Sequence, residues 1–368
     1  MQITIVAGAR PNFIKIAPII RAVKAAHARG IDISYRLVHT GQHYDKKMSG
    51  DFFDQLDIPN PDVNLECGSG SQAEQTASIM VKFEKELIAN KPSVVLVVGD
   101  VTSTMACTIV AKKLCIDAVH VEAGIRSGDM TMPEEINRIV TDSICDHFFT
   151  TTESAGIQLA QNGIAENRIH FVGNTMIDTL NYNLNRLKKP DFWEEKNLKP
   201  GSYFILTLHR PSNVDDFTNL KNILEVILQN TDGLPVVFPV HPRTKKILDS
   251  AHFTDPKLIQ IDPLGYLEFI YMVKNCKAVI TDSGGITEET TVLKIPCLTL
   301  RSTTERPETI TIGSNELVGI NPSDLKPFLV KLKDGKWKQS GIPRLWDGQT
   351  SDRIVNKLID LYSNHKAK

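Results

Sequence analysis

Acidic and basic residues cluster in this sequence where short apolar segments end. The clusters are Gly8-Ala9-Arg10-Pro11, Gly99-Asp100, His120-Val121-Glu122-Ala123-Gly124, Pro133-Glu134-Glu135, His209-Arg210, His241-Pro242 and Asp282-Ser283-Gly284-Gly285. Carboxylates and imidazoles can transfer protons, whereas Arg, Lys and exposed backbone N–H groups can bind an anion. Ligands of open α/β sheets bind at the carboxyl ends of the strands. We therefore expect one polar site between two domains, which is typical of an enzyme.

Two turns are candidates for binding a negatively charged group. The first contains Arg10, and Lys15 follows near the start of the next helix. The second is Ser283-Gly284-Gly285, which follows an apolar strand and opens a helix, so that its N–H groups and the helix dipole can attract a phosphate. Neither turn has the GxGxxG spacing of a dinucleotide site. For Arg10 and Lys15, an ordinary solvated surface position is the alternative interpretation.

Most of the acidic residues have a structural interpretation beside a catalytic one. Asp100 stands where a helix cap is expected, and Glu134 follows a proline at an ordinary helix start. Glu289 lies early in the helix after the glycine pair, where it either complements the helix dipole or binds the hydroxyls of a ribose. Glu122 differs because it ends an apolar strand, where an unpaired charge is costly.

The histidines of the second half also follow strands. A single histidine at such a place is usually structural, but His209 and His241 end successive strands near the glycine pair, which favours contact with a ligand. The histidines and acids lack HExxH or similar metal-ligand spacing, so we expect no metal ion.

The elements that must position these residues alternate between apolar runs and amphipathic helices. The runs that read as strands are residues 3–6, 35–38, 94–98, 118–121, 147–150 and 169–172, then 203–208, 236–240, 258–261, 278–281, 296–300 and 316–318. Near-continuous apolar strands joined by helices predict parallel sheets covered on both faces. A polar stretch at residues 187–201 separates the two series.

We therefore predict an α/β protein with two doubly wound, Rossmann-like domains facing a central cleft. The expected boundaries are residues 1–175 for the domain with the carboxylates and 176–352 for the domain with the glycine pair. Residues 353–368 are expected to form a final helix that packs back towards the first domain.

Composition limits the classes of partner. The 368 residues carry a net charge of −1, with 41% hydrophobic residues, so we expect neither a nucleic-acid nor a membrane partner. The first residues read as a strand rather than a signal peptide. The six cysteines show no CxxC spacing and read as reduced, packed thiols, so a cytoplasmic location is expected.

Taken in order, the motifs resemble those of the non-hydrolysing UDP-N-acetylglucosamine 2-epimerases, which have the two-domain glycosyltransferase-B fold. The resemblance covers nearly the whole chain and rests on the combined set rather than on any single motif. The matching residues are Gly8-Ala9-Arg10-Pro11 with Lys15, His39-Thr40-Gly41-Gln42-His43, Gly99-Asp100, His120-Val121-Glu122-Ala123-Gly124-Ile125-Arg126, Pro133-Glu134-Glu135-Ile136-Asn137-Arg138, Gly173-Asn174-Thr175, Thr207-Leu208-His209-Arg210, Asp282-Ser283-Gly284-Gly285-Ile286 with Glu288-Glu289, and Thr303-Thr304-Glu305-Arg306-Pro307-Glu308.

This resemblance implies a reversible inversion at C2 of UDP-N-acetylglucosamine, through elimination of UDP to a 2-acetamidoglucal, without a cofactor. By position, the acid–base group consists of Asp100, Glu122, Glu134 and His209. The implied residues that bind the UDP-sugar are Arg10, Lys15, His241, Leu264, Phe269, Ser283, Gly284, Gly285, Glu289 and Arg306. Leu264 and Phe269 would contact the uracil and Glu289 the ribose. The resemblance also implies a homodimer.

Other functions are compatible with parts of the pattern. The same chemistry on a UDP-2,3-diacetamido-uronic sugar is one alternative, and a glycosyltransferase or phosphorylase on the same fold is another. A UDP-sugar sensor without turnover is a third, although the intact set of acids and His209 argues against it. A hydrolysing epimerase is a fourth.

Overall fold

The computed structural model of the chain describes residues 1–41, 53 and 55–362. Gln42 and His43, which belong to one of the motifs above, lie outside the described residues. The chain forms two compact units: unit 1 comprises Met1–Tyr182 and the chain from Arg344 onward, and unit 2 comprises Asn183–Pro343.

The unit boundaries differ from residues 175 and 352, where the sequence placed them. Helix α7 (Thr175–Asn183) belongs largely to unit 1, because Thr179 Oγ1 donates to Ile14 O at 2.6 Å. The chain returns to unit 1 at Arg344 because the segment that follows is fixed there: Trp346 Nε1 donates to Thr151 O at 3.1 Å, and the Asp178 carboxylate accepts from the backbone N of Thr350 at 3.1 Å.

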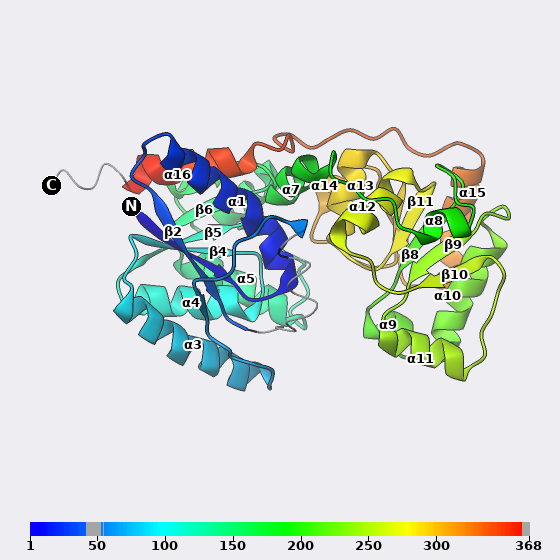
Figure 1. The fold of residues 1–368 in the computed structure, drawn as a ribbon, viewed down its shortest axis with the longest axis horizontal. Coiled ribbons are helices and arrows are strands. Elements are labelled where there is room, and N and C mark those ends of the chain that lie inside the picture. Colours follow the sequence, from blue (N-terminus) through cyan, green and yellow to red (C-terminus); the bar gives the residue numbers. More distant parts are fainter. Residues whose placement is uncertain (42–52, 54, 363–368) are drawn as a thin grey trace. The chain divides into compact units, whose positions relative to one another are not determined.

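Unit 1 is built on a seven-stranded sheet with the order β3-β2-β1-β4-β5-β6-β7, and every strand pair is parallel (Figure 1). The strands are β1 (Gln2–Ala7), β2 (Ser34–His39), β3 (Val63–Asn64), β4 (Val94–Val98), β5 (Asp117–Val121), β6 (His147–Thr150) and β7 (Ile169–Phe171). All five residues of β4 are buried, as expected for a strand covered on both faces.

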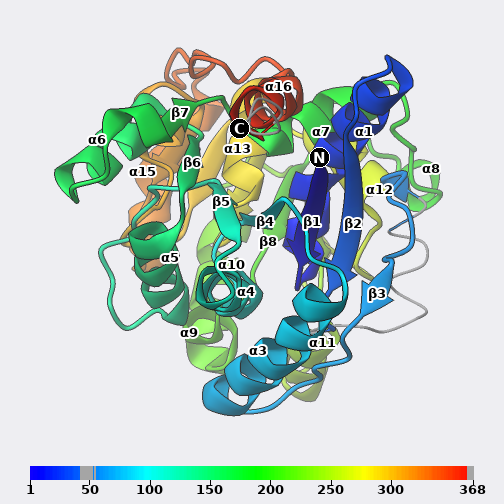
Figure 2. The ribbon, with the colours of Figure 1, turned by 90° about the vertical axis from the view of Figure 1, so that its left-hand side faces the viewer.

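Helices cover both faces of this sheet (Figure 2). On one face lie α1 (Arg10–Ala28), α7 and α16 (Thr350–Tyr362), and α16 packs against α1. On the other face lie α3 (Gln72–Ala89), α4 (Thr102–Lys113) and α5 (Pro133–Ile144), with Ile79, Phe83 and Val110 in the core beneath them. Helix α6 (Glu153–Gln161) and the 3-10 turn η1 (Glu166–Arg168) precede β7.

Unit 2 has a six-stranded parallel sheet with the order β10-β9-β8-β11-β12-β13. The strands are β8 (Phe204–Thr207), β9 (Val236–Pro239), β10 (Leu258–Ile261), β11 (Ala278–Thr281), β12 (Cys297–Thr299) and β13 (Asn315–Leu317). Its helices are α8 (Phe192–Glu195), α9 (Pro211–Val214), α10 (Phe217–Gln229), α11 (Pro242–Ser250), α12 (Tyr266–Asn275), α13 (Ile286–Leu293), α14 (Pro307–Thr311), the 3-10 turn η2 (Pro322–Asp324) and α15 (Leu325–Lys333).

Successive residues of the unit 2 strands enter two separate cores. Phe204 and Leu206 pack with α10, whereas Tyr203 and Ile205 pack with α12 on the opposite face. Because side chains alternate across a strand, this division requires apolar residues at every strand position. The predicted α/β class with two doubly wound sheets is confirmed.

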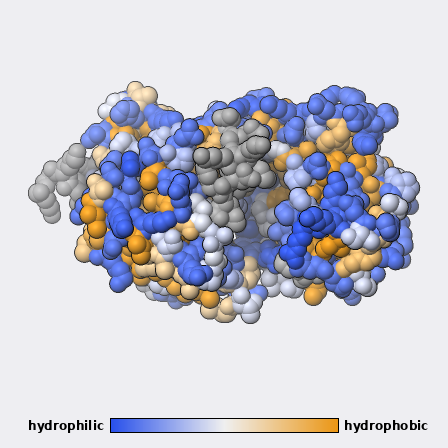
Figure 3. Space-filling view, turned by 60° about the horizontal axis from the view of Figure 1, so that its bottom comes forward, coloured by the Kyte–Doolittle hydropathy of each residue, from blue (hydrophilic) through white to orange (hydrophobic). Residues whose placement is uncertain are grey.

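Hydrophobic residues are scattered among hydrophilic ones on the face drawn in Figure 3. Among the described residues, no helix is both long enough and apolar enough to cross a membrane.

Candidate active site

Each sheet has a switch point where the strand order reverses. In unit 1 this point lies between β1 and β4, and in unit 2 it lies between β8 and β11. In open α/β sheets the crevice outside such a point is where ligands bind. The predicted site residues follow these strands: Lys15 comes after β1, Asp100 after β4, His209 after β8 and Ser283 after β11.

The turn after β1 is held against β4 by Asn12. Its Oδ1 accepts from the backbone N of Gly8 at 3.0 Å and of Ala9 at 3.1 Å, and its Nδ2 donates to Val98 O at 3.1 Å. Asn12 is buried, so the turn and the end of β4 form one fixed unit. Arg10 is the first residue of α1, and its side chain lies outside the described part of the structure.

Lys15 is paired with Glu122 rather than standing alone. Lys15 Nζ lies 2.7 Å from Glu122 Oε1, and the side chains are only 13% and 7% exposed. The ammonium group passes directly over Gly99, where an added Cβ would lie 3.1 Å from Nζ and where φ is +68°. The positive φ favours glycine at position 99, and a side chain there would crowd the Lys15 ammonium group. The predicted anion ligand thus stabilises the charge of a predicted acid–base residue.

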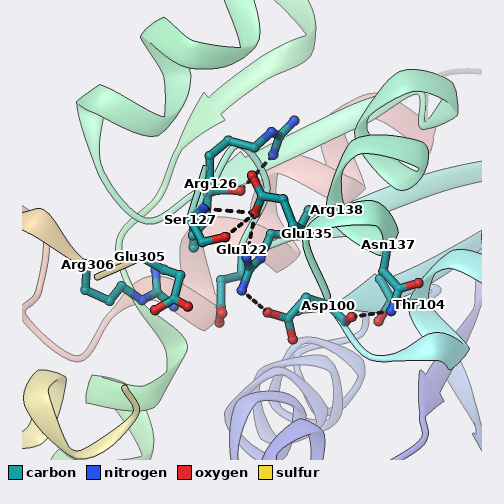
Figure 4. A network of polar contacts seen from close by, with 12 residues as sticks. Asp100, Thr104, Glu122, Arg126, Ser127, Glu135, Asn137, Arg138, Glu305 and Arg306 are labelled. Atoms are coloured by element: carbon teal, nitrogen blue, oxygen red, sulfur yellow. Dashed lines mark hydrogen bonds and ion pairs between the residues drawn. The ribbon is translucent and has the colours of Figure 1, made fainter. Parts of the chain in front are cut away.

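Asp100 does not cap α4, because the N-cap residue is Val101. Instead, Arg138 Nη2 donates to Asp100 Oδ2, and Asn137 Nδ2 donates to Asp100 O at 2.8 Å (Figure 4). Asp100 and Glu122 follow paired strand residues, since Val98 and Val121 are register partners. The structure therefore places these two carboxylates at neighbouring strand ends, each beside a cation.

Glu134 lies in the first turn of α5, partly exposed, and makes no hydrogen bond or ion pair with any residue that the structure describes. It precedes Asn137 and Arg138 by three and four residues, so it lies on the face of α5 that holds Asp100.

Glu135 is a residue that the sequence argument did not select. It is buried, and its carboxylate accepts from the backbone N of Ser127 at 2.9 Å, from Ser127 Oγ at 3.0 Å and from the backbone N of Gly128 at 3.2 Å (Figure 4). Arg138 Nη1 also donates to it at 2.8 Å. Burial acts to raise the pKa of Glu135, but these donors hold it below its usual range. Glu135 therefore fixes the loop between Glu122 and Glu134.

In unit 2, His209 is oriented by Asp282. His209 Nδ1 lies 2.6 Å from Asp282 Oδ1, and Asp282 also accepts from Asn213 Nδ2 at 3.0 Å and from the backbone N of Arg210 at 2.9 Å. Burial acts to raise the pKa of Asp282, but His209 and the other donors hold it below its usual range. An ionised carboxylate only accepts, so Nδ1 of His209 carries a proton. The side chain is 60% exposed, so its Nε2 edge is accessible to a ligand.

The glycine pair opens α13, as predicted. Gly285 is the N-cap residue, and a Cβ built on it would meet no atom within 4 Å. A Cβ on Gly284 would lie 3.3 Å from Nη1 of the buried Arg301, whose guanidinium binds Glu305 through both terminal nitrogens at 2.9 and 2.7 Å. The open space beside the N-terminus of a helix fits an anionic group.

Two further predicted ligand residues have protein partners within unit 2. Arg306 is buried, and its Nε is paired with the carboxylate of Glu288. Glu289 is buried, and its Oε1 accepts from Tyr266 Oη at 2.9 Å. Burial raises the pKa of Glu289 to about 7, so its charge is sensitive to pH near neutrality.

The remaining predicted ligand residues have structural roles in this structure. His241 is exposed and caps α11, since its Nδ1 accepts from the backbone N of Arg243 at 3.3 Å. Leu264 and Phe269 are partly buried against the core beneath α12. Contact of these three residues with a substrate stays a prediction. Among the described residues, no group of three or more His, Cys, Asp or Glu side chains could hold a metal ion.

Two doubly wound sheets, with supported carboxylates at one switch point and a histidine beside a helix N-terminus at the other, define an α/β enzyme suited to a phosphorylated substrate. The family model described as UDP-N-acetylglucosamine 2-epimerase matches residues 24–359. The chain belongs to this family, and it is an epimerase.

Individual relatives agree with this assignment. The chain is 43% identical over 371 residues to the UDP-N-acetylglucosamine 2-epimerase of Methanocaldococcus jannaschii, covering 97% of this chain and 99% of that protein. It is 36% identical to the UDP-2,3-diacetamido-2,3-dideoxy-D-glucuronate 2-epimerase of Pseudomonas aeruginosa, covering 98% and 100% of the two chains. A crystal structure of the M. jannaschii UDP-GlcNAc 2-epimerase in complex with UDP-GlcNAc and UDP superposes with a TM-score of 0.85 at 42% identity, covering 98% and 100%.

Proposed function

We propose that this enzyme interconverts UDP-N-acetylglucosamine (UDP-GlcNAc) and UDP-N-acetylmannosamine (UDP-ManNAc) by inverting C2 of the sugar. The observation that carries the proposal is the pair of carboxylates at adjacent strand ends, Asp100 and Glu122, each stabilised by a cation of unit 1. Relatives named for this reaction match almost the full length of the chain.

The reaction requires a proton to leave a carbon that is barely acidic, because C2 is not next to a carbonyl group. Breaking the C1–O bond to UDP first gives C1 cationic character, which acidifies the C2–H bond. A carboxylate then takes the proton, and the products are a 2-acetamidoglucal and UDP. Return of a proton to the opposite face of C2, with re-addition of UDP at C1, gives the epimer.

In this mechanism the acids of unit 1 move the C2 proton. Asp100, Glu122 and Glu134 are the candidates, and two carboxylates on opposite faces of the sugar suffice for removal and return. Glu122 lies beside Lys15 and Asp100 beside Arg138, so each of these two candidate bases has a cation next to it.

Unit 2 stabilises the departing UDP in this proposal. The N-terminus of α13 and the protonated form of His209 would offset the charge that develops on the β-phosphate, which lowers the barrier to C1–O cleavage. Ser283, Gly284, Gly285 and Arg306 are the proposed phosphate ligands, and Glu289 the proposed ribose ligand.

A second substrate is supported by one observation. The P. aeruginosa relative, named for a UDP-diacetamido-glucuronate, matches the whole chain at 36% identity, so a related uronic sugar is the alternative substrate. We also propose a homodimer in the cytoplasm. None of the six cysteines forms a disulfide, which fits a reducing compartment.

The test is proton NMR of the purified enzyme with UDP-GlcNAc in D2O, without added cofactor. We expect UDP-ManNAc with deuterium at C2, because the proton that returns comes from solvent. Glu122→Gln serves as the control and should abolish the exchange. Release of free ManNAc would indicate hydrolysis, and an unchanged spectrum beside turnover of the diacetamido-uronate would move the assignment to that sugar.

A further inference from the structure

His120 is a fully buried histidine of β5 whose two ring nitrogens are both engaged. Its Nε2 lies 2.8 Å from the carbonyl oxygen of Gly99, the residue before Asp100. Its Nδ1 lies 2.7 Å from Asp142 Oδ1 on α5. The ring therefore lies beneath the turn that carries Asp100, with no exposed surface of its own.

The partners of His120 determine where its protons are. A carbonyl oxygen can only accept, so Nε2 carries a proton. Asp142 Oδ2 accepts from the backbone N of Gly124 at 3.1 Å and from Arg126 Nη1 at 2.6 Å. Burial acts to raise the pKa of Asp142, but His120 and Arg126 hold it below its usual range. Both oxygens of Asp142 are therefore engaged, Oδ1 with His120 and Oδ2 with Gly124 and Arg126.

The two turns joined by this network have backbone conformations that need support. Glu122 has φ of +74°, which is unfavourable for a residue with a side chain, and Gly99 and Gly124 have φ of +68° and +80°. At Gly124 a Cβ would lie 2.3 Å from Ala155 O, so only glycine fits there. Asp142 binds the N–H of Gly124, two residues after Glu122, and thereby holds the strained turn closed.

We propose that His120 is a positioning residue for the epimerase: one buried imidazole ring fixes the Asp100 turn through Gly99 O and the Glu122 turn through Asp142. The two carboxylates then keep their separation because both turns are tied to the same buried ring. This inference rests on the proposed function for its catalytic part, whereas the positioning itself is a property of unit 1. His120 does not touch the substrate.

Three variants test the proposal. His120→Leu removes both hydrogen bonds. Asp142→Asn can keep the same contacts, since its amide oxygen can accept from Gly124 and Arg126 while its NH2 donates to Nδ1 of His120. Val119→Ala is the matched control, because it removes buried apolar volume from the same strand and leaves both turns intact.

For His120→Leu we expect kcat to fall by about 100-fold or more, with KM and the Kd for UDP within about threefold of the wild type. Asp142→Asn should retain kcat within about tenfold, and Val119→Ala should retain it within about twofold despite a lower Tm. Nitrogen-15 NMR of labelled histidine should show Nε2 of His120 protonated in both the wild type and Asp142→Asn, because Gly99 O can only accept.

A second readout does not depend on turnover. Amide hydrogen exchange at residues 99–104 and 121–126 should accelerate by about tenfold or more in His120→Leu but not in Val119→Ala. If the wild type fails to epimerise UDP-GlcNAc, the proposed function fails, and the exchange data alone decide whether His120 positions these turns. Unchanged exchange in His120→Leu, or a kcat equal to that of Val119→Ala, would overturn the proposal.

Discussion

The two units each contain a histidine paired with a buried aspartate, and the pairs differ in what the second ring nitrogen faces. Nδ1 lies 2.7 Å from Asp142 in the His120 pair and 2.6 Å from Asp282 in the His209 pair. The His120 side chain has no exposed surface and its Nε2 meets a backbone carbonyl, whereas His209 is 60% exposed. The same kind of pair therefore holds a turn in unit 1 and leaves an imidazole accessible in unit 2.

The difference in burial explains why the two histidines have different partners. A buried donor without a hydrogen-bond partner destabilises the folded state, so both ring nitrogens of a buried histidine need partners within the protein. An exposed histidine can leave one nitrogen to water and exchange that water for a phosphate oxygen. A histidine–aspartate pair thus indicates a site only when one edge of the ring stays accessible.

The largest effect should come from the three candidate proton-transfer acids of unit 1. Asp100→Asn, Glu122→Gln and Glu134→Gln should each lower kcat by about 100-fold or more, because each removes a proton-transfer group while keeping its shape. Binding of UDP, measured by calorimetry, should persist because the proposed UDP ligands lie in unit 2. Near-normal turnover in all three variants would show that these acids are not the proton-transfer groups.

Substitutions of the two histidines should have different effects on stability when stability and activity are measured on the same variants. His209→Gln should lower kcat by about 10- to 100-fold with a change in unfolding free energy below ~0.5 kcal/mol, since an exposed side chain loses little on substitution. His120→Gln should cost about 1–3 kcal/mol, because Asp142 or Gly99 O is left without its donor. Denaturant unfolding monitored together with steady-state kinetics checks both values. If the two variants lose the same amount of stability, burial does not explain the different roles of His120 and His209.

The sequence predicted the sheets well because strand patterns are local. Residues 94–98 read as a strand covered on both faces from their composition alone, and β4 is Val94–Val98. The turn chemistry was also local: the glycine pair opens α13 as expected. The unit boundaries were displaced because α7 and the Trp346 segment are fixed to unit 1 by contacts distant in sequence, such as Trp346 with Thr151.

The pairing of charges could not be predicted, because it depends on which strands become neighbours. Asp282 lies 73 residues after His209, and they meet only because β11 pairs with β8. Lys15 and Glu122 are separated by 107 residues, so their ion pair could not be read from the sequence. Glu134 and Glu135 both follow Pro133 at an ordinary helix start. Their adjacency does not indicate which of the two side chains is buried.

A smaller effect is expected from the buried acid of unit 2, whose described hydrogen-bond partner is a phenol rather than a cation. The pKa of Glu289 is raised to about 7 by burial, so Glu289 gains a proton as the pH falls through that value. If its carboxylate accepts from a ribose, affinity for uridine should fall by about three- to tenfold between pH 8 and pH 6. Uridine is the appropriate probe because it has no phosphate that titrates in this range. The matched control is Glu289→Gln, which should bind uridine with a flat pH profile; a slope retained in that variant would exclude Glu289 as its source.

The smallest effect concerns a third histidine pair, His147 and His170, whose ring nitrogens lie 3.3 Å apart. Burial, Lys357 and His147 lower the pKa of His170 to about 4. The unfolded chain therefore binds a proton between about pH 6.5 and pH 4 that the folded state does not, so stability falls as the pH drops through this window and the loss levels off below it. His170→Gln should make the decline of Tm with pH shallower, by an amount equivalent to about 1–2 kcal/mol after solvent screening. Val119→Ala changes no titratable group, so it should show the wild-type slope over the same window. If His170→Gln and the wild type decline in parallel, the His147–His170 pair is not the source of the acid destabilisation.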